Sequence, residues 1–543
     1  MESDRLVEFK KLAELHEKLR STSSRNAKVA MIAEFLRSLS AREAVPAIVM
    51  LTGRRLPGED DSKVMVGWKT VLKSLPTKPP ARGSIEDAGE LVEIALRHRG
   101  SFQAALEDRP ITISEVYELF KALASVKGEG AIEKRVALLR SVFRRASPKE
   151  GALIARILLG DMRAGVAEGV IEEAVIKALG VDHETGEYVM GVLGGPWEAA
   201  AIALNRGVEA LREVKPQVFK PIKPMLAQQA TSPEEALKLV GSPAYAEPKL
   251  DGARVQVHFR KGEVRIFSRR RHDITRSFLD VADSLASVLD GREGILEGEI
   301  IAMSGERPLP FNVLMRRFRR REPAEEVKVR IYLFDAILLD GDVFIDKSYL
   351  ERRRTLASVA GEELLVQNTV VESTGDVSQE FRKAVELGYE GLVLKNPRSK
   401  YVPGRRGFNW VKLKRALTAD LVIVAAEWGY GRRTGWLSNY HLAARDEETG
   451  ELLVVGKTFK GLTDEEFEEM TRRLLSIKVG EFKRGIVVRP EVVVEVEYDE
   501  VQPSPKYRAG IALRLARIKR IREDKSVSEV DTVQELAKQL KVR

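Results

Sequence analysis

The feature that most constrains the fold of this chain is a change of sequence pattern across residues 214–224. This segment holds three prolines, Pro216, Pro221 and Pro224, and proline disfavours regular secondary structure. Apolar residues at helical spacing precede the segment, whereas stretches of alternating apolar and polar residues, typical of β-strands, follow it. The chain must therefore fold as a helical part joined to a part that contains sheets.

Residues 1 to about 213 are predicted to be helical throughout. In the stretch 171–179 apolar residues recur at helical spacing, and Gly180 follows as a stop signal. The stretches 116–126 and 131–143 have similar spacing, and strand patterns are scarce in this third of the chain. The N-terminal domain should therefore be all-α.

The middle third has the pattern of mixed α and β structure. Apolar and polar residues alternate over 255–259, a Lys261-Gly262 turn follows, and apolar residues recur over 264–267, which predicts a β-hairpin. Further strands are expected over 295–302, 331–339 and 391–395, with a helix over 379–387. This pattern predicts an α+β domain.

A second change of pattern falls near residues 415–419, beyond which strands dominate. They are expected over 421–427, 440–444, 451–457 and 491–498. A five-stranded barrel with a terminal helix would fit this length, and the OB-fold is a small all-β barrel that commonly binds oligonucleotides. Because domains usually have roughly 100–200 residues, we expect three in this 543-residue chain, over 1–217, 218–417 and 418–543.

Charge and missing residue types limit the function classes. The formal net charge of +9 favours a polyanionic partner such as nucleic acid, although a basic protein without such a partner fits equally well. The absence of cysteine excludes disulfides, thiolate zinc sites and iron–sulfur clusters. Neither a membrane-spanning apolar run nor a signal-peptide pattern is present, so we expect a cytoplasmic protein.

The strongest chemical signal is the segment 246–254, Ala-Glu-Pro-Lys-Leu-Asp-Gly-Ala-Arg. A lone lysine is normally a solvated surface charge. Lys249 differs because apolar and small residues surround it, so partial burial is expected. Burial and nearby cations lower the pKa of a lysine and free its amine to act as a nucleophile.

The segment 249–254 resembles the K-x-D-G-x-R motif of the covalent nucleotidyltransferases, which comprise DNA ligases, RNA ligases and capping enzymes. Further segments resemble the other motifs of that superfamily, in the same order: 267–270, 296–299, 332–335, 390–395, 410–414 and 520–525. The segment 159–165 is similar to the DNA-binding domain of archaeal and eukaryotic replicative ligases. The chain as a whole resembles an ATP-dependent DNA ligase of this type.

The resemblance implies a role for each matched residue. Lys249 would attack the α-phosphate of ATP, Glu247 would accept a hydrogen bond from the adenine amino group, and Phe334 would stack on the adenine. Arg254 and Arg269 resemble residues that hold the ribose and phosphates.

The remaining matched residues concern the phosphates and the metal. Glu299 also resembles a ribose- or phosphate-binding residue, and Arg406 matches a further nucleotide contact. Lys412 and Lys414 should share one face of a strand and neutralise charge on the α-phosphate. Glu299 and Glu390 are carboxylates suited to Mg²⁺, so ATP and Mg²⁺ are the expected cofactors.

The implied reaction seals nicks between a 5′-phosphate and a 3′-hydroxyl through a lysine–AMP intermediate and a DNA-adenylate, in replication, repair and recombination. The implied partner of this monomeric, membrane-free protein is nicked double-stranded DNA, contacted in part by Arg163. A sliding clamp is a further candidate partner, although the segment 101–106 matches a clamp-binding peptide only weakly. Arg522, Asp524 and Lys525 lie on the predicted barrel, which should swing onto the nucleotide to orient pyrophosphate and then rotate to clamp DNA.

Several alternatives remain open at this point. Phe334 could be a core residue, and Glu297 with Glu299, like Lys412 with Lys414, could form a solvated strand face. An RNA ligase or a capping enzyme is the competing enzyme, although capping enzymes usually lack a helical N-terminal domain. A third interpretation is a non-catalytic DNA-binding protein that retains a decayed ligase core. The presence of all the residues expected to carry the chemistry argues against it.

Overall fold

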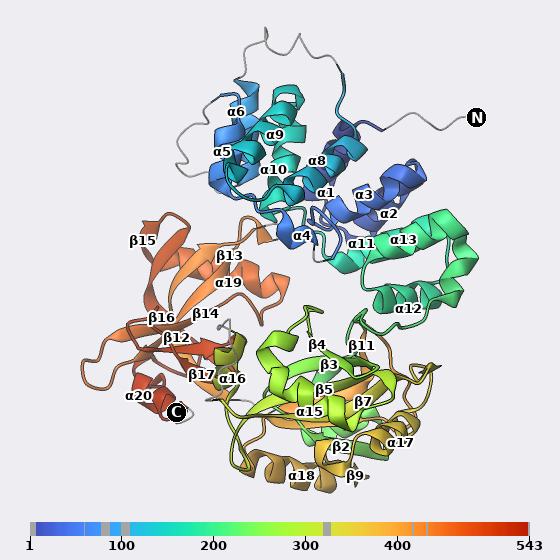
Figure 1. Ribbon diagram of the computed structural model, residues 1–543. Helices are drawn as coiled ribbons and strands as arrows, with labels where there is room; N and C mark the ends of the chain where they lie inside the picture. The colour runs from blue at the N-terminus through green and yellow to red at the C-terminus, as the bar shows by residue number, and fades with distance from the viewer. Residues whose placement is uncertain are drawn as a thin grey trace.

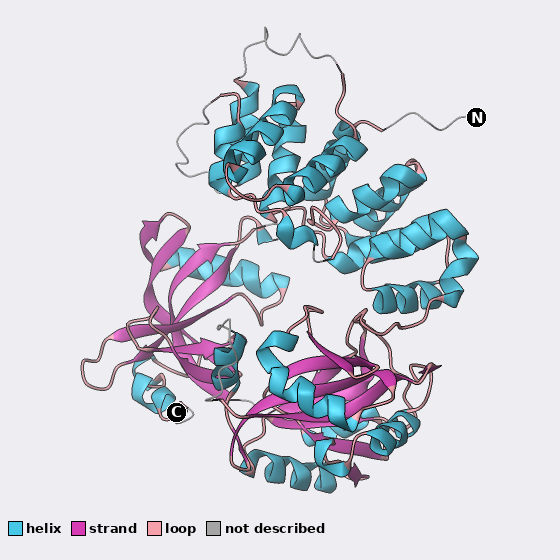
Figure 2. Cartoon of the chain, viewed as in Figure 1, coloured by secondary structure: helices cyan, strands magenta, loops and turns pink. Residues whose placement is uncertain are grey.

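The computed structural model describes residues 7–58, 60–77, 87–98, 109–318, 327–414, 417–430 and 433–540. Figure 1 shows a helical body above two others, one of mixed structure and one of strands, which lie side by side. Figure 2 shows that helices alone make up the upper body. The predicted fold class is confirmed, whereas the clamp-like segment 101–106 lies outside the described residues.

The N-terminal body consists of helices packed around one apolar core. Helix α10 illustrates the local signals: Ser147 caps its first turn, Pro148 begins it, and Gly160 ends it in a left-handed conformation. The described helices are α1 (Phe9–Ser21), α2 (Arg25–Arg37), α3 (Ala41–Leu51), α4 (Asp60–Lys63), α5 (Trp68–Ser74), α6 (Ala88–Arg97), α8 (Ile113–Ser125), α9 (Ala131–Arg145), α10 (Pro148–Leu159), α11 (Glu168–Leu179), α12 (His183–Leu193), α13 (Pro196–Arg206) and the 3₁₀ turn η1 (Val208–Glu213).

The central body contains two sheets. One has the order β1-β11-β10-β2-β9, and the other β4-β3-β5-β7-β8 with β6 on β5. The strands are β1 (Leu226–Ala230), β2 (Ala244–Pro248), β3 (Ala253–Arg260), β4 (Glu263–Ser268), β5 (Glu293–Ser304), β6 (Arg307–Pro308), β7 (Val329–Leu339), β8 (Asp342–Val343), β9 (Thr369–Val371), β10 (Gly391–Lys395) and β11 (Arg406–Lys414). The helices are α14 (Pro233–Val240), η2 (Thr275–Phe278), α15 (Leu279–Val288), α16 (Phe311–Phe318), α17 (Tyr349–Val359), η3 (Glu362–Leu364) and α18 (Thr374–Glu386).

The predicted hairpin is confirmed as β3 and β4, which pair antiparallel with Val257 opposite Ile266. Each sheet buries apolar side chains against its own helices, with α15 and α17 on the second sheet and α14 and α18 on the first. A third apolar cluster, which includes Leu250, Phe334 and Trp410, joins the two sheets. The candidate functional residues of the central body lie along this junction.

The C-terminal β domain begins at β12 and differs from the sequence-based expectation in two ways. Its sheet has the order β14-β13-β12-β16-β15 with β19 on β16, and β17 pairs with β18, so it has more strands than the five expected. Its main helix, α19, lies within the sequence of the domain and packs Phe467, Met470 and Leu474 into the core, whereas the terminal helix α20 is short. The elements are β12 (Leu417–Trp428), β13 (Leu437–Arg445), β14 (Leu452–Thr458), α19 (Asp464–Ser476), β15 (Lys478–Phe482), β16 (Gly485–Tyr498), β17 (Glu500–Pro503), β18 (Ile511–Arg514), β19 (Arg517–Ile521), η5 (Val527–Glu529) and α20 (Val533–Ala537).

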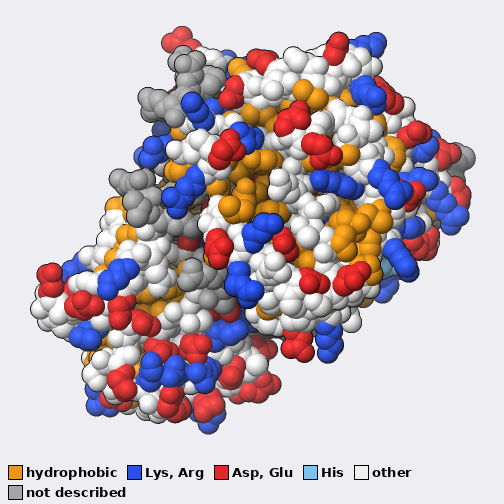
Figure 3. All heavy atoms as spheres, turned by 90° about the horizontal axis from the view of Figure 1, so that it is seen from below, with side chains coloured by type: hydrophobic (Ala, Val, Ile, Leu, Met, Phe, Trp, Pro, Cys, Tyr) orange, Lys and Arg blue, Asp and Glu red, His pale blue; other side chains and the backbone are white. Residues whose placement is uncertain are grey.

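The surface of these bodies carries charges of both signs. Seen from below, lysines and arginines alternate with acidic side chains over the central body and the C-terminal β domain (Figure 3). Among the described residues, none of the helices is both long enough and apolar enough to pass through a membrane.

Candidate active site

A cavity of about 570 Å³ lies between the two central sheets, a size within the usual range for small-molecule sites. The C-terminal β domain closes part of its mouth with Asp499, Arg514 and Leu515. All of the predicted site residues line it: Glu247, Lys249, Arg254, Arg269, Glu299, Phe334, Glu390, Arg406, Lys412 and Lys414. The fold thus gathers side chains from β3, β5, β7, β11 and the ends of β2, β4 and β10 around one space.

The backbone fixes the position of Lys249. The residue follows β2 directly, its N–H donates to the carbonyl of Gly391 at 2.8 Å, and its own carbonyl accepts from the N–H of Glu390 at 3.0 Å. A Cβ on Gly252 would stand 2.2 Å from the carbonyl oxygen of Ile300, so the turn after Lys249 accepts only glycine without a backbone shift. This pairing places Lys249 beside Glu390.

The ammonium group of Lys249 forms an ion pair with the carboxylate of Glu390. Burial alone would lower the pKa of Lys249, but the charges of Glu390, Glu299 and Asp251 outweigh it and raise the pKa above its usual value. The sequence-based expectation of a lowered pKa is therefore wrong for the nucleotide-free protein. The reason is that the two strongest acidic neighbours, Glu390 and Glu299, come from distant segments, whereas only the weaker one, Asp251, is close to Lys249 in the sequence.

Glu299 also lines the cavity and interacts with the charges of Lys249 and Glu390. Burial raises the pKa of Glu299 to about 7, and the charges of Lys249 and Arg254 only partly oppose that rise. The alternative that Glu297 and Glu299 form a solvated strand face is wrong, because Glu297 is fully buried and Glu299 half-buried.

The carboxylates of Glu299 and Glu390 suit Mg²⁺, a hard cation that prefers oxygen ligands. Within the described ranges, no three His, Cys, Asp or Glu side chains are grouped as ligands for a metal. Mg²⁺ commonly takes one or two carboxylates together with phosphate oxygens and water, which matches this pair.

The cations of the cavity lie mainly at the end near Lys249. Lys412 and Lys414 both line the cavity while Leu413 between them is buried in the core, so the two lysines share a face of β11 as predicted. Burial and the charges of Lys414 and Lys249 lower the pKa of Lys412 to about 8. Arg269 and Arg406 are exposed at the same rim, and each has other cations nearby. We call this part the phosphate end.

The opposite part, which we call the base end, is built from aromatic rings. Phe334 is 9% exposed and meets Trp410 edge to face, with ring centroids 6.0 Å apart. The guanidinium of Arg254 lies 5.4 Å from the centroids of both rings and donates to Glu297 at 2.7 Å and to the carbonyl of Met225 at 2.6 Å. Burial would lower the pKa of Arg254, but Glu297 raises it above its usual value.

Sequence reasoning placed Lys395 in the matched segment 390–395 but gave no role to this residue, the buried lysine of the base end. Its ammonium lies 2.7 Å from Glu247 and contacts the rings of Phe334, Tyr349 and Trp410. The second carboxylate oxygen of Glu247 accepts a hydrogen bond from the hydroxyl of Tyr349 at 2.6 Å. A carboxylate oxygen can accept a second hydrogen bond, so Glu247 retains capacity for an adenine amino group.

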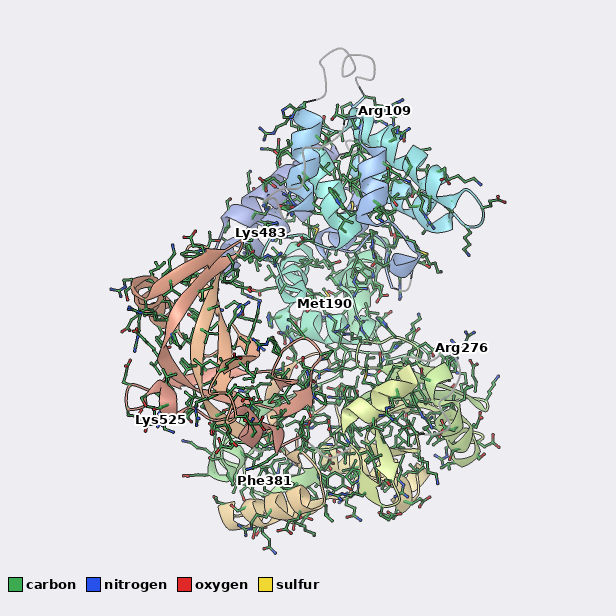
Figure 4. All side chains as sticks on the ribbon, turned by 90° about the vertical axis from the view of Figure 1, so that its left-hand side faces the viewer. Arg109, Met190, Arg276, Phe381, Lys483 and Lys525 are labelled. Carbon is green, nitrogen blue, oxygen red and sulfur yellow. The ribbon has the colours of Figure 1, made fainter. Side chains whose placement is uncertain are left out.

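Arg522, Asp524 and Lys525 lie away from the cavity, as the sequence predicted. Arg522 donates to both carboxylate oxygens of Asp420 at 2.9 Å, and Lys525 donates to the same carboxylate at 2.7 Å. Figure 4 shows Lys525 at the outer edge of the C-terminal β domain. In this arrangement the three residues of the last motif contact their own domain.

Comparisons with protein families match most of the chain. Residues 8–176 match the model of the DNA ligase N terminus, residues 224–414 the ATP dependent DNA ligase domain, and residues 433–525 the ATP dependent DNA ligase C terminal region. The central match spans every residue that lines the cavity except the three from the C-terminal β domain.

Individual relatives are similar over the full length. The chain is 45% identical to DNA ligase 1 of Korarchaeum cryptofilum over 97% of both chains. It is 38% identical to the DNA ligase of Thermococcus onnurineus, over 98% of this chain and 97% of that one. The solved structure of "Pmar-Lig_PreS3" has a similar fold, with a TM-score of 0.57, 18% identity, and coverage of 94% of this chain and 99% of that one.

Proposed function

The chain belongs to the ATP-dependent DNA ligases, and we propose on this premise that Lys249 is the residue that carries AMP. The protein is an enzyme that seals nicks in DNA with ATP through a covalent adenylate. The observation that most supports Lys249 is its position: the amine stands in one cavity with cations, carboxylates and aromatic rings from many separate strands.

In the first step, the Nζ of Lys249 attacks the α-phosphorus of ATP. A P–N bond forms, the bond from the α-phosphorus to the bridging oxygen of pyrophosphate breaks, and the amine loses a proton. Before this step the ammonium of Lys249 must give up a proton to solvent, because a protonated amine has no lone pair. Lys412 and Lys414 favour that loss by cationic charge, and they also offset negative charge that grows on the α-phosphate.

Glu299 and Glu390 are the residues that would hold Mg²⁺ in this proposal. The ion, when bound, supplies positive charge that polarises the phosphate. At the base end, Phe334 would stack on the adenine, and Glu247 would accept from its amino group while Lys395 and Tyr349 hold the carboxylate in place. Arg254, Arg269 and Arg406 would contact the ribose and phosphates.

In the later steps, the AMP passes to the 5′-phosphate at the nick, and the 3′-hydroxyl then attacks that phosphorus and expels AMP. We assign these steps to three domains, over 1–217, 218–417 and 418–543, which bind nicked duplex DNA mainly through its phosphates. For this reaction Arg522, Asp524 and Lys525 must leave Asp420 and approach the pyrophosphate. A monomeric state and a sliding-clamp partner complete the proposal.

The loop around Arg163 supports a DNA contact. Lys28 is buried and donates to the carbonyls of Ala164 and Gly165 at 2.8 and 2.9 Å, and His16 bonds the carbonyl of Met162 at 2.7 Å. These bonds hold the loop from inside the helical body, while Arg163 is exposed with a left-handed backbone. An exposed arginine on a fixed loop suits a phosphate contact.

Label transfer from ATP labelled at the α-phosphate tests the role of Lys249. The wild-type protein should retain label after denaturation, whereas Lys249→Ala should not, and chelation of Mg²⁺ should also prevent labelling. Lys400→Ala, which removes an exposed lysine of the same domain, is the matched control and should be labelled normally. Label on Lys249→Ala would reject the proposal, and sealing of nicked RNA in preference to nicked DNA would reject the substrate.

The role of the last motif is tested by Arg522→Ala. We expect slower adenylation of Lys249 with little change in the sealing of DNA that is already adenylated. Arg489→Ala is the control, because Arg489 lies outside the motif, pairs with Glu491 on β16 of the same domain and is exposed. Equal adenylation rates for both variants would contradict the swing of this domain.

A further inference from the structure

A second contact between the C-terminal β domain and the cavity was not expected from the sequence. Asp499 lies between β16 and β17, and its N–H donates to the carbonyl of Arg514 at 3.0 Å, so the end of β18 holds the turn. The Oδ2 of Asp499 accepts a hydrogen bond from the Nζ of Lys414 at 3.0 Å.

The Asp499 contact places Lys414 between two carboxylates. Glu390 of the central body lies 3.7 Å from the ammonium, and Asp499 lies closer, at 3.0 Å. Arg514, the other charged residue that this domain brings to the cavity, pairs with Glu500 at 3.0 Å. Among the three cavity residues of the C-terminal β domain, Asp499 is therefore the one that brings negative charge to Lys414.

We propose that Asp499 occupies Lys414 in place of a nucleotide phosphate, so that ATP binds in competition with this contact between the two domains. The inference rests on the proposed function, because it takes Lys414 as a phosphate-binding cation. A carboxylate oxygen and a phosphate oxygen are both anionic acceptors for an ammonium group. The two therefore compete for Lys414, and the ammonium interacts less strongly with each when both are present. Asp499 is then a positioning residue whose contact must open before the triphosphate can use Lys414.

The arrangement of the last motif agrees with this competition. While Asp499 contacts Lys414, Arg522 and Lys525 are held on Asp420. The same domain thus presents an acidic residue to the cavity and keeps its candidate pyrophosphate-binding cations elsewhere. Binding of ATP would exchange an anionic face of the domain for a cationic one.

The test is the affinity of α,β-methylene-ATP, which cannot transfer its AMP and so reports binding alone. We expect Asp499→Asn to lower the Kd by about two- to fivefold, the effect of a half-buried ion pair, and the difference should shrink at high salt. Glu497→Gln is the matched control, because Glu497 pairs with Lys519 at 3.1 Å within its own domain, and its Kd should equal that of the wild type. An unchanged or higher Kd for Asp499→Asn would overturn the inference.

Adenylation kinetics separate this inference from the proposed function. Asp499→Asn should lower the KM for ATP and leave kcat for Lys249 adenylation unchanged at saturating ATP. A lower kcat would mean that Asp499 supports the site, and it would overturn the competition. Failure of the wild type to form the adenylate would reject the role of Lys249, whereas the comparison of analogue affinities would still decide the role of Asp499.

Discussion

The two ends of the cavity use ion pairs in opposite ways. At the base end, Lys395 and Glu247 are 2% and 4% exposed, and three aromatic rings contact the ammonium of Lys395. At the phosphate end, Lys249 and Glu390 are each 22% exposed, and Lys414 and Asp499 are 19% and 30% exposed. The first pair is enclosed by protein, whereas the second group remains open to solvent and to a ligand.

This difference indicates which contacts change when ATP binds. The pair at the base end has hydrogen-bond partners from the protein itself, so it can remain in place and offer a shaped surface to the adenine. At the phosphate end the cations are neutralised by carboxylates that phosphates can replace. On the proposed function, the base end is organised in advance, while the phosphate end would work by exchange of partners.

The largest expected effect concerns stability and tests the enclosed character of the base end. Lys395→Met would leave the buried carboxylate of Glu247 without its cation, and we expect the free energy of unfolding to fall by about 3–5 kcal/mol. Chemical denaturation measures it. The double variant Lys395→Met with Glu247→Gln should recover part of the loss, and a loss below about 1 kcal/mol would show that this pair is not truly enclosed.

The second prediction concerns the pH dependence of the phosphate end. Glu299 has its pKa raised to about 7 from a usual value of 4.5, so it stabilises the fold fully below about pH 4.5 and loses that contribution as the pH rises through 7. Between pH 5 and pH 8, the wild type should therefore lose about 2.5 kcal/mol relative to Glu299→Gln. The free energy of unfolding of both proteins is measured by chemical denaturation at several pH values. The same pH dependence for the wild type and Glu299→Gln would show that Glu299 is not buried as a neutral acid.

The third prediction tests the role of the aromatic surface. Phe334→Leu keeps an apolar side chain but removes the ring, so the KM for ATP in Lys249 adenylation should rise by roughly tenfold, the lower range of base–aromatic stacking. Phe381→Leu is the control because Phe381 lies on α18, outside the cavity (Figure 4). Equal KM values for the two variants would show that Phe334 only packs in the core and does not stack on the adenine.

The smallest expected effect returns to the phosphate end. Lys414→Met should change the free energy of unfolding by less than about 1 kcal/mol, because an ion pair open to solvent contributes little. The same denaturation assay as for Lys395→Met gives a direct comparison. A loss as large as that of Lys395→Met would remove the distinction between the two ends.

The sequence was sufficient wherever the signal was local or ordered along the chain. The alternation over 255–259 and the turn after it predicted the β3–β4 hairpin, and the order of the motifs predicted which strands supply the cavity. Helix α19 was overlooked although its apolar residues Phe467, Met470 and Leu474 have helical spacing and Thr463 with Glu466 forms a capping box. Its many charged residues and flanking strands obscured that signal.

Contacts between distant segments could not be derived in this way. An isolated lysine at the end of β10 gives no sign that Glu247 will stand beside it, because the two meet only when β2 pairs with β10. The raised pKa of Lys249 depends likewise on Glu390, and the contact of Asp499 depends on how two domains meet. Sequence patterns specify strands and their faces, but such pairs require the tertiary arrangement.

The position of Lys414 along the chain has a mechanical consequence. It is the last residue of β11, and Leu417 already belongs to β12 of the next domain. In the proposed swing of that domain, atoms close to Lys414 would move little, while atoms at the far edge, such as those of Lys525, would travel further. A change of partner at the ammonium of Lys414 would thus accompany a much larger displacement at the far edge of the C-terminal β domain.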